Sequence, residues 1–271
     1  FSIIIIIIII FIILFLLLKS GKKGTYISGK KMADGQKGTY ITMTTIPERL
    51  TNDWFYNNLQ RTISLLSENQ TLVINIPRIS SKKILYNIPP KIKNLQGKKF
   101  IINNCEKDEG PITKILPTLR NSKIPDESII IVCDDDIVYK KNTFNLLENS
   151  ILKNPDCVSS MCNIAVQGFK TFGFTKKIVK PILNINIPTS CFRVDDDVMD
   201  WYFKKMKLKI IPVPYEGNTE WHCTLNKETT DGHPDWTELN EDEENGDRAR
   251  YQKTCKNELS INNTAPLHAL S

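Results

Sequence analysis

The stretch Ser128-Ile129-Ile130-Ile131-Val132-Cys133-Asp134-Asp135-Asp136 decides the fold. Its first part is an uninterrupted apolar run, which is typical of a central parallel strand buried on both faces. Three carboxylates follow the run directly, and open α/β sheets bind their ligands just beyond the carboxyl ends of their strands. The stretch therefore predicts a parallel sheet with a polar site at the end of this strand.

Segments with the patterns of strands and helices alternate on both sides of this stretch. Short apolar runs predict strands, and apolar residues at helical spacing predict helices. The strands are expected at 40–44, 72–76, 99–102, 158–166 and 209–213, and the helices at 54–66, 111–119, 144–152 and 198–206. This alternation is typical of a Rossmann-like three-layer α/β sandwich, in which helices cover both faces of a mostly parallel sheet.

Asp134 and Asp136 are the candidate metal ligands. Residues i and i+2 of an extended segment project to the same side, so these two side chains can converge while Asp135 points away. Two neighbouring carboxylates repel each other, and a hard divalent cation would relieve the repulsion and also bind a diphosphate. We therefore expect a Mg²⁺ or Mn²⁺ diphosphate site. A polar turn or a helix cap is the alternative interpretation.

With this motif the chain resembles glycosyltransferases of the GT-A fold, and more narrowly the family-2-like enzymes of bacteria and large DNA viruses. Four stretches carry the resemblance in order: TMTTIPER at 42–49, GPITKIL at 110–116, DDDIVY at 134–139 and DDDV at 195–198. The resemblance implies metal-dependent transfer of a sugar from a nucleotide-sugar donor, with a UDP-sugar as the first candidate. The acceptor would be a hydroxyl group of a glycan, a protein or a lipid.

The resemblance also assigns the donor-binding residues. Hydroxyl and guanidinium groups after the first strand can hold a base, a ribose or a phosphate. On the second wall, a glycine allows close backbone approach and a lysine supplies charge. The alternative interpretation of Arg49 and Lys114 is that each lies at a solvated helix end. The donor-binding candidates are Thr44, Thr45, Arg49, Asp108, Gly110, Lys114 and Asp135.

The late acidic motif contains the catalytic candidates. In the resembling enzymes this position provides the carboxylate that takes a proton from the acceptor hydroxyl. Asp196 or Asp197 matches that carboxylate. Because Asp195 adds a third aspartate to the motif, the sequence does not decide between the two. The reaction would then invert the anomeric carbon. Acidic residues in the first turn of a helix can also be simple caps. Such families often add a C-terminal histidine to the metal, for which His222 is the first candidate and His233 the second.

The amino-terminal segment is almost wholly apolar. Residues 1–18 contain only Ser2 as a polar residue, and at about 1.5 Å per residue they reach ~27 Å, close to the thickness of a bilayer core. We expect a transmembrane helix at 1–18, a flexible basic linker at 19–38 and a GT-A-like domain at 39–271. The protein would be a single-pass membrane protein with the side of its domain left open. A cleaved signal peptide is the alternative.

The distribution of charge and of cysteine residues argues against two further classes of protein, nucleic-acid-binding proteins and structural zinc proteins. The net charge is +6, but five lysines lie at 19–31, within the expected linker, so no nucleic-acid partner is expected. Seven cysteines occur without a C-x-x-C pair, which argues against a structural zinc site. A nucleotidyl or phosphoryl transferase stays as an alternative, although the chain has no glycine-rich phosphate loop. A membrane-tethered module that binds carbohydrate or metal without catalysis is the third possibility.

Overall fold

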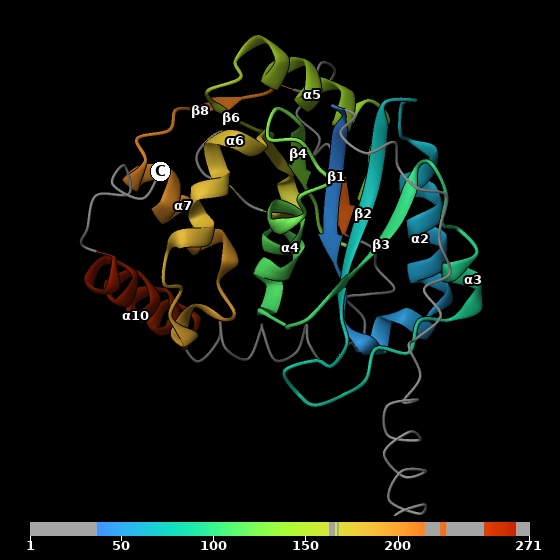
Figure 1. The fold of residues 1–271 in the computed structure, drawn as a ribbon, viewed down its shortest axis with the longest axis horizontal. Coiled ribbons are helices and arrows are strands. Elements are labelled where there is room, and N and C mark those ends of the chain that lie inside the picture. Colours follow the sequence, from blue (N-terminus) through green and yellow to red (C-terminus); the bar gives the residue numbers. More distant parts are fainter. Residues whose placement is uncertain (1–36, 163–165, 167, 215–222, 226–246, 264–271) are drawn as a thin grey trace, which may run out of the picture. The chain divides into compact units, whose positions relative to one another are not determined.

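The computed structural model describes residues 37–162, 166, 168–214, 223–225 and 247–263. Seven strands form one sheet in the order β3-β2-β1-β4-β7-β6-β8 (Figure 1). A two-stranded sheet pairs β5 (Ile137–Tyr139) with β9 (Cys223–Leu225). The strands of the larger sheet are β1 (Thr39–Thr44), β2 (Gln70–Pro77), β3 (Phe100–Cys105), β4 (Ile129–Val132), β6 (Val158–Ser160), β7 (Phe172–Thr175) and β8 (Ile210–Pro212).

The larger sheet is mixed but mostly parallel, as the sequence predicts. Strand β1 pairs in parallel with both β2 and β4, and β2 pairs in parallel with β3. The unexpected strand β7 is antiparallel to β4 and to β6. Strands β1, β2 and β3 follow one another in one direction across the sheet, and β4 then pairs on the other side of β1. The strand order therefore reverses between β1 and β4. Open α/β sheets bind ligands at such a reversal.

Helices cover both faces of this sheet (Figure 1). Helices α2 and α5 pack on one face, whereas α4 and α7 pack on the other. The α-helices are α2 (Asp53–Ser64), α3 (Pro90–Lys93), α4 (Leu116–Arg120), α5 (Thr143–Lys153), α6 (Lys176–Val179), α7 (Asp195–Lys205) and α10 (Asp247–Asn262). Short 3₁₀ helices are η1 (Pro47–Thr51), η2 (Gly110–Lys114), η3 (Gly168–Lys170), η4 (Lys180–Asn184) and η5 (Thr189–Cys191).

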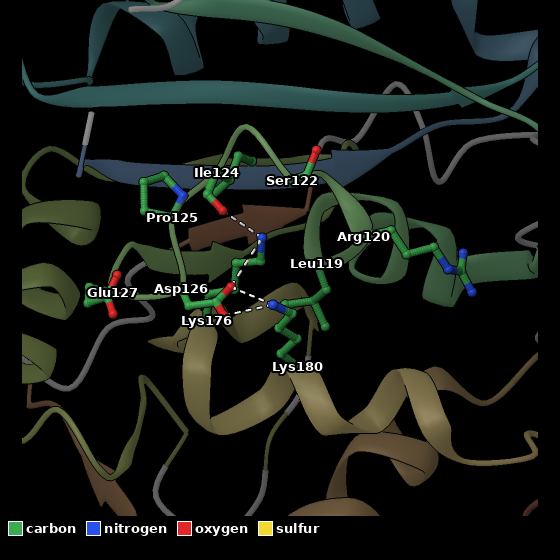
Figure 2. Close-up of a pocket in the computed structure, with 9 residues that line it drawn as sticks. All are labelled: Leu119, Arg120, Ser122, Ile124, Pro125, Asp126, Glu127, Lys176 and Lys180. Carbon is green, nitrogen blue, oxygen red and sulfur yellow. Dashed lines mark hydrogen bonds and ion pairs between the residues drawn. The ribbon is translucent and has the colours of Figure 1, made fainter. Parts of the chain in front are cut away.

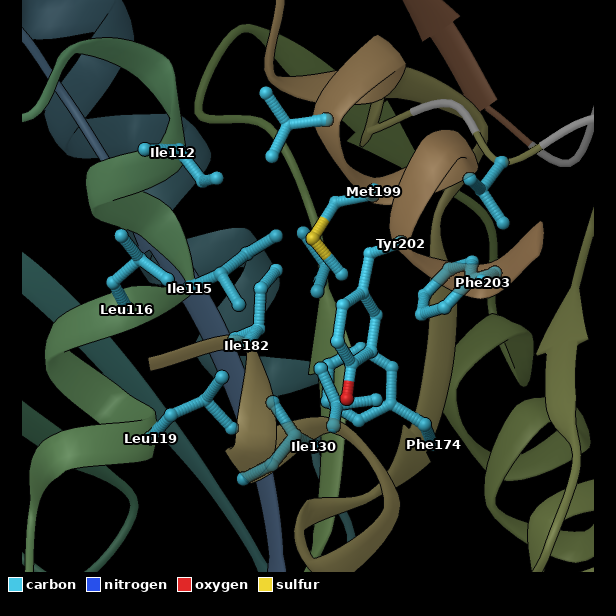
Figure 3. Close-up of a cluster of buried hydrophobic side chains, with 14 of the residues drawn as sticks. Ile112, Ile115, Leu116, Leu119, Ile130, Phe174, Ile182, Met199, Tyr202 and Phe203 are labelled. Atoms are coloured by element: carbon cyan, nitrogen blue, oxygen red, sulfur yellow. The ribbon is translucent and has the colours of Figure 1, made fainter. Parts of the chain in front are cut away.

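Strand β4 divides its side chains between two hydrophobic cores. Ile130 and Val132 point into the core formed with α4 and α7, part of which is shown in Figure 3. Ile129 and Ile131 point into the core formed with α2 and α5. All four side chains are buried, and burying one such side chain contributes about 1.5–3 kcal/mol. The apolar run of the sequence thus forms the strand that both cores share, with the three-layer arrangement that the sequence predicts.

Two expected elements differ in the structure. The helix expected at 111–119 is divided into η2 and α4, because Pro117 cannot occupy a helix interior and lies instead in the first turn of α4. The strand expected at 158–166 ends at Ser160. Helix α10 was not predicted, because its apolar residues have no clear helical spacing.

The predicted single-pass membrane localisation is contradicted. Within the part of the chain that the structure describes, no helix is both long enough and apolar enough to cross a bilayer. The span expected at 1–18 lies outside the described residues, as does most of the linker expected at 19–38.

Candidate functional site

The early acidic motif forms a tight turn at the strand-order reversal. Strand β4 ends at Val132, and the chain turns at Asp135 and Asp136 before it enters β5. Asn58 Nδ2 donates hydrogen bonds to the carbonyl oxygens of Asp135 (2.9 Å) and Ile137 (3.1 Å). Tyr139 Oη accepts a hydrogen bond from the Asp134 N–H at 2.8 Å. The turn is therefore held by helix α2 and by strand β5.

This turn changes which way the three carboxylates point. Asp135 does not face away from the site: its carboxylate accepts hydrogen bonds from Thr45 Oγ1 (2.6 Å) and Arg49 Nη1 (2.5 Å). Arg49 Nη2 also lies 3.4 Å from Asp136 Oδ2. The extended geometry assumed from the sequence does not hold because the strand ends before the motif. Thr45 and Arg49, expected beside a nucleotide, here fix the middle carboxylate.

Lys114 joins the early motif to the late one. Its ammonium lies 2.5 Å from Asp134 Oδ1 and 2.9 Å from Asp195 Oδ2, and only 7% of its side chain is exposed. Its backbone carbonyl accepts hydrogen bonds from Thr42 Oγ1 and Asn75 Nδ2, which belong to β1 and β2. Two acidic motifs that are about sixty residues apart in sequence therefore meet at one buried cation.

Negative charge exceeds positive charge around Lys114. Burial alone would lower the pKa of Lys114, but the charges of Asp134, Asp195 and Asp196 outweigh burial and raise that pKa well above its usual value. The pKa of Asp196 is raised to about 8 by burial and then by Asp195, against the opposing effect of Lys114. The carboxyl groups of Asp134, Asp195 and Asp196 thus surround a single ammonium group.

The first turn of helix α7 holds its three aspartates in different ways. Asp195 pairs with Lys114, Asp196 Oδ1 accepts a hydrogen bond from the Gly168 N–H at 2.9 Å, and Asp197 Oδ1 lies 2.7 Å from Lys256 Nζ. The N-cap residue of α7 is Val194, which makes no side-chain capping hydrogen bond. The aspartates are therefore not N-caps, although the helix dipole still favours acidic residues in this turn.

Two further expected site residues form hydrogen bonds with backbone groups. Thr44 Oγ1 donates to the carbonyl oxygen of Asn75, and Asp108 accepts hydrogen bonds from the backbone N–H groups of Gly110 and Ser81. His222 and His233 lie outside the described residues.

The close approach predicted for Gly110 is made to a backbone group. Its φ is +73°, and a Cβ atom there would lie 2.2 Å from the carbonyl oxygen of Phe192. This position therefore requires glycine both for its backbone conformation and for its contact with the segment before the late motif.

Gly168 borders the site and begins the stretch 168–174, whose two glycines and three aromatic residues indicate either an acceptor-side loop or packing. A Cβ atom at Gly168 would lie 2.6 Å from Lys114 Nζ and 2.8 Å from Asp134 Oδ1. The backbone of Gly168 therefore packs directly over this ion pair, and its N–H reaches Asp196. No local pattern in the sequence indicates this contact, because Gly168 is far along the chain from both motifs.

The early motif fits a divalent cation in part. No group of three or more His, Cys, Asp or Glu side chains among the described residues is arranged to hold a metal ion. Mg²⁺ sites, however, often use one or two carboxylates with waters and substrate phosphates. Asp134 and Asp136 are the more exposed carboxylates of the turn, at 24% and 17%, against 8% for Asp135. Burial raises the pKa of Asp136 to about 6 despite Arg49, so this carboxylate lacks a full counter-charge.

A separate pocket lies near the opposite end of strand β4. It has a volume of about 560 Å³ and is shown in Figure 2. Lys176 Nζ donates to the carbonyl oxygens of Asn121 (2.8 Å) and Ile124 (2.6 Å), and Lys180 pairs with Asp126 at 2.7 Å. These contacts give Lys176, Lys180 and Asp126 structural roles, and neither acidic motif lines the pocket.

Replacing Lys114 by Met should destabilise the fold. Removing one partner of a buried ion pair leaves uncompensated carboxylates at Asp134 and Asp195, at a cost of about 3 kcal/mol in the free energy of unfolding. The matched control is Lys204→Met, which breaks a pair with Asp200 whose lysine is 74% exposed and should cost less than about 1 kcal/mol. Urea denaturation measures both. Equal losses would contradict a buried bridge at Lys114.

The raised pKa of Asp196 predicts how stability depends on pH. Because the folded-state pKa of about 8 exceeds the usual 3.8, the folded state binds this proton more tightly than the unfolded state does. The stability from this group is complete below pH ~4 and is lost as the pH rises through about 8. Asp196→Asn should therefore lose less stability than the wild type between pH 5.5 and 8.5, as urea midpoints would show. The exposed control Asp156→Asn should behave like the wild type.

Comparisons with known proteins give structural likenesses at low sequence identity. No protein-family model and no curated protein matches the chain. The mannosyltransferase PcManGT from Pyrobaculum calidifontis, solved with GDP-Man and Mn²⁺, is 11% identical with a TM-score of 0.48. The match covers 68% of this chain but only 59% of that enzyme.

Two further solved structures match the same share of this chain as PcManGT does. A cytidylyltransferase from Leptospira borgpetersenii is 14% identical, with a TM-score of 0.45 and coverage of 68% of this chain and 78% of its own. A 4-diphosphocytidyl-2C-methyl-D-erythritol synthase is 7% identical, with a TM-score of 0.43 and coverage of 68% and 94%. Likenesses at this level carry no argument about function, which must come from the side chains.

Proposed function

We propose that this chain is a metal-dependent glycosyltransferase of the GT-A, family-2-like type. It would move a sugar from a nucleotide-sugar donor to an acceptor hydroxyl on a glycan, a protein or a lipid. The observation that carries the proposal is the meeting of both acidic motifs at buried Lys114, beside the strand-order reversal. Such a site can place a charged donor and an acceptor proton within reach of carboxylates from two different elements.

On the donor side, Asp134 and Asp136 would hold Mn²⁺ or Mg²⁺. The cation would neutralise charge on the diphosphate leaving group. Arg49 and Thr45 support this role because they fix Asp135, which keeps the turn in place between the two proposed ligands. Lys114 then serves to hold the two motifs together. His222 is proposed as a further ligand on the resemblance alone.

The nucleotide would lie along the ends of β1 and β2. We assign Thr44, Thr45 and Arg49 to one wall, and Asp108 and Gly110 to the other, with a UDP-sugar as the first donor to test. The cationic Arg49 also stacks over Trp54, with 5.9 Å between its guanidinium carbon and the ring centroid. This contact limits the freedom of the guanidinium beside a negatively charged ligand.

On the acceptor side, Asp196 is the proposed general base. Asp195 and Asp197 each have a lysine partner, whereas Asp196 accepts a single hydrogen bond from Gly168. A general base works best with a pKa near the working pH. With a pKa of about 8, the ionised form of Asp196 that can accept a proton increases as the pH rises through that value. Asp197, the other sequence candidate, would support the turn through Lys256.

The proposed reaction is a single displacement. The acceptor hydroxyl gives its proton to Asp196, and its oxygen forms a bond to the anomeric carbon. The bond from that carbon to the diphosphate oxygen breaks on the opposite face, so the configuration inverts. The products are the glycosylated acceptor and a nucleoside diphosphate.

A donor panel tests the proposed function. The full chain would be incubated with Mn²⁺ and a panel of nucleotide sugars, beginning with UDP-sugars, and nucleoside diphosphate would be measured with and without EDTA. Release from at least one donor that EDTA abolishes is expected. A parallel reaction with nucleoside triphosphates and sugar phosphates detects the nucleotidyl transferase, which would release pyrophosphate. Metal and nucleotide binding without either product would instead identify a binding module.

A further inference from the structure

Helix α10 has few apolar contacts of its own. It lies against η5 and α7, far from the edge strand β3 (Figure 1). Two of its described apolar side chains, Cys255 and Leu259, are buried, while Tyr251 and Ile261 are 42% and 70% exposed. A helix that buries so little apolar surface is held mainly by other interactions.

A disulfide and several polar contacts supply these interactions. Cys191 at the end of η5 is bonded to Cys255 of α10, across 64 residues of sequence. Four residues after Cys191, the late acidic motif begins. The polar contacts are Ser190 Oγ to Glu258 Oε2 at 2.7 Å, Trp201 Nε1 to Ser260 Oγ at 3.3 Å, and Asn186 with Asn263 at 2.9 and 3.0 Å.

The residue after the bonded cysteine reaches the late acidic motif. Lys256 Nζ lies 2.7 Å from Asp197 Oδ1, and 12% of the Asp197 side chain is exposed. Without this ammonium, Asp197 would be a mostly buried carboxylate beside Asp195 and Asp196, and charges of one sign repel each other in such a place. The disulfide at Cys255 therefore fixes the position from which Lys256 neutralises Asp197.

We propose that α10 is a clamp on the first turn of α7, fastened by the Cys191–Cys255 disulfide, and that Lys256 is a positioning residue for Asp196. The role of Lys256 rests on the proposed function, in which Asp196 is the general base, whereas the clamp formed by α10 does not depend on that function. Lys114 holds Asp195 from one side and Lys256 holds Asp197 from the other. Asp196 is thereby kept in one orientation between two neutralised neighbours.

Amide hydrogen exchange of the full chain tests the clamp without any substrate. Excess dithiothreitol reduces the disulfide, giving two cysteine thiols and oxidised dithiothreitol, and the double variant Cys191→Ala/Cys255→Ala removes it. Both should make amides at 189–198 exchange at least about tenfold faster, with β1 and β4 unchanged. Faster exchange confined to α10 would overturn the proposal. Reduction of the wild-type protein gives the same comparison if the double variant does not fold.

Turnover tests the role of Lys256. With the donor found in the panel, Lys256→Met should lower kcat by about tenfold and leave the donor KM unchanged, because a displaced base affects the reaction and not donor binding. Lys256→Arg should restore most of kcat. The control Lys253→Met, at an exposed position of the same helix, should match the wild type.

The outcomes separate the two proposals. If Lys256→Met and Lys253→Met have the same kcat, Lys256 has no positioning role. A wild-type protein that turns over no donor contradicts the proposed function, while hydrogen exchange still decides whether α10 clamps the turn.

Discussion

Asp196→Asn should lower turnover by ~10² to 10⁴ while donor affinity stays within about threefold of the wild type. An amide cannot take the proton from the acceptor hydroxyl, but it fills nearly the same volume and can still accept the hydrogen bond from Gly168. The loss should therefore appear in kcat alone. Steady-state kinetics and calorimetric titration with the nucleoside diphosphate and Mn²⁺ measure the two quantities.

The matched control for this variant is Asp197→Asn in the same helical turn. Its carboxylate pairs with Lys256, so its replacement should lower turnover far less than Asp196→Asn does. A carboxylate that only stabilised the turn would behave differently, because losing it would lower the melting temperature by an amount equivalent to about 0.5–2 kcal/mol and leave turnover near normal. If both variants retain full turnover, the late motif is structural.

Asp136→Asn should weaken Mn²⁺-dependent nucleotide binding by at least about 100-fold. Even outer partners of metal ligands change metal affinity by 10- to 100-fold, and this substitution removes one charge from the proposed ligand pair itself. The side chain lies in a site where burial disfavours its charge, which a divalent cation would offset. Calorimetry with the nucleoside diphosphate and Mn²⁺ measures the affinity.

Asp126→Asn is the control for this second variant, since Asp126 is a carboxylate near the opposite end of β4 that pairs with Lys180. It should leave nucleotide affinity unchanged. An Asp136→Asn protein that binds as tightly as the wild type would remove Asp136 from the metal site.

The parallel half of the sheet could be predicted because each of its strands has an apolar pattern within its own short stretch of sequence. The apolar run before Asp134 forms β4, and β1 and β2 have the expected positions within about two residues. Strand β7 was missed because its alternating Phe172 and Phe174 lie within a glycine-containing segment that resembles a loop. Both side chains are buried in the core, so tertiary packing decides this strand.

Candidate site residues could be named from the sequence, but their contacts could not be predicted. The apolar strand before it indicated Asp134, and the family resemblance indicated Lys114 and Asp196. The bridge from Lys114 to Asp195 depends instead on how η2 and α7 pack. The orientation of Asp135 follows from a turn held by Asn58, which has no signature in the motif itself. Lys256 could not be found because its helix shows no amphipathic pattern and is bonded to a distant cysteine.

The central claim is that the early and late acidic motifs are two walls of one metal-dependent site, and paramagnetic broadening by Mn²⁺ tests it most directly. Amide signals of the full chain would be recorded by NMR with the nucleoside diphosphate and with Mg²⁺ or Mn²⁺. We predict that Mn²⁺ broadens the signals of Asp136, Gly168 and Asp196 together, while Lys176 near the opposite end of β4 keeps its signal. Broadening that spares Gly168 and Asp196 would contradict a shared site.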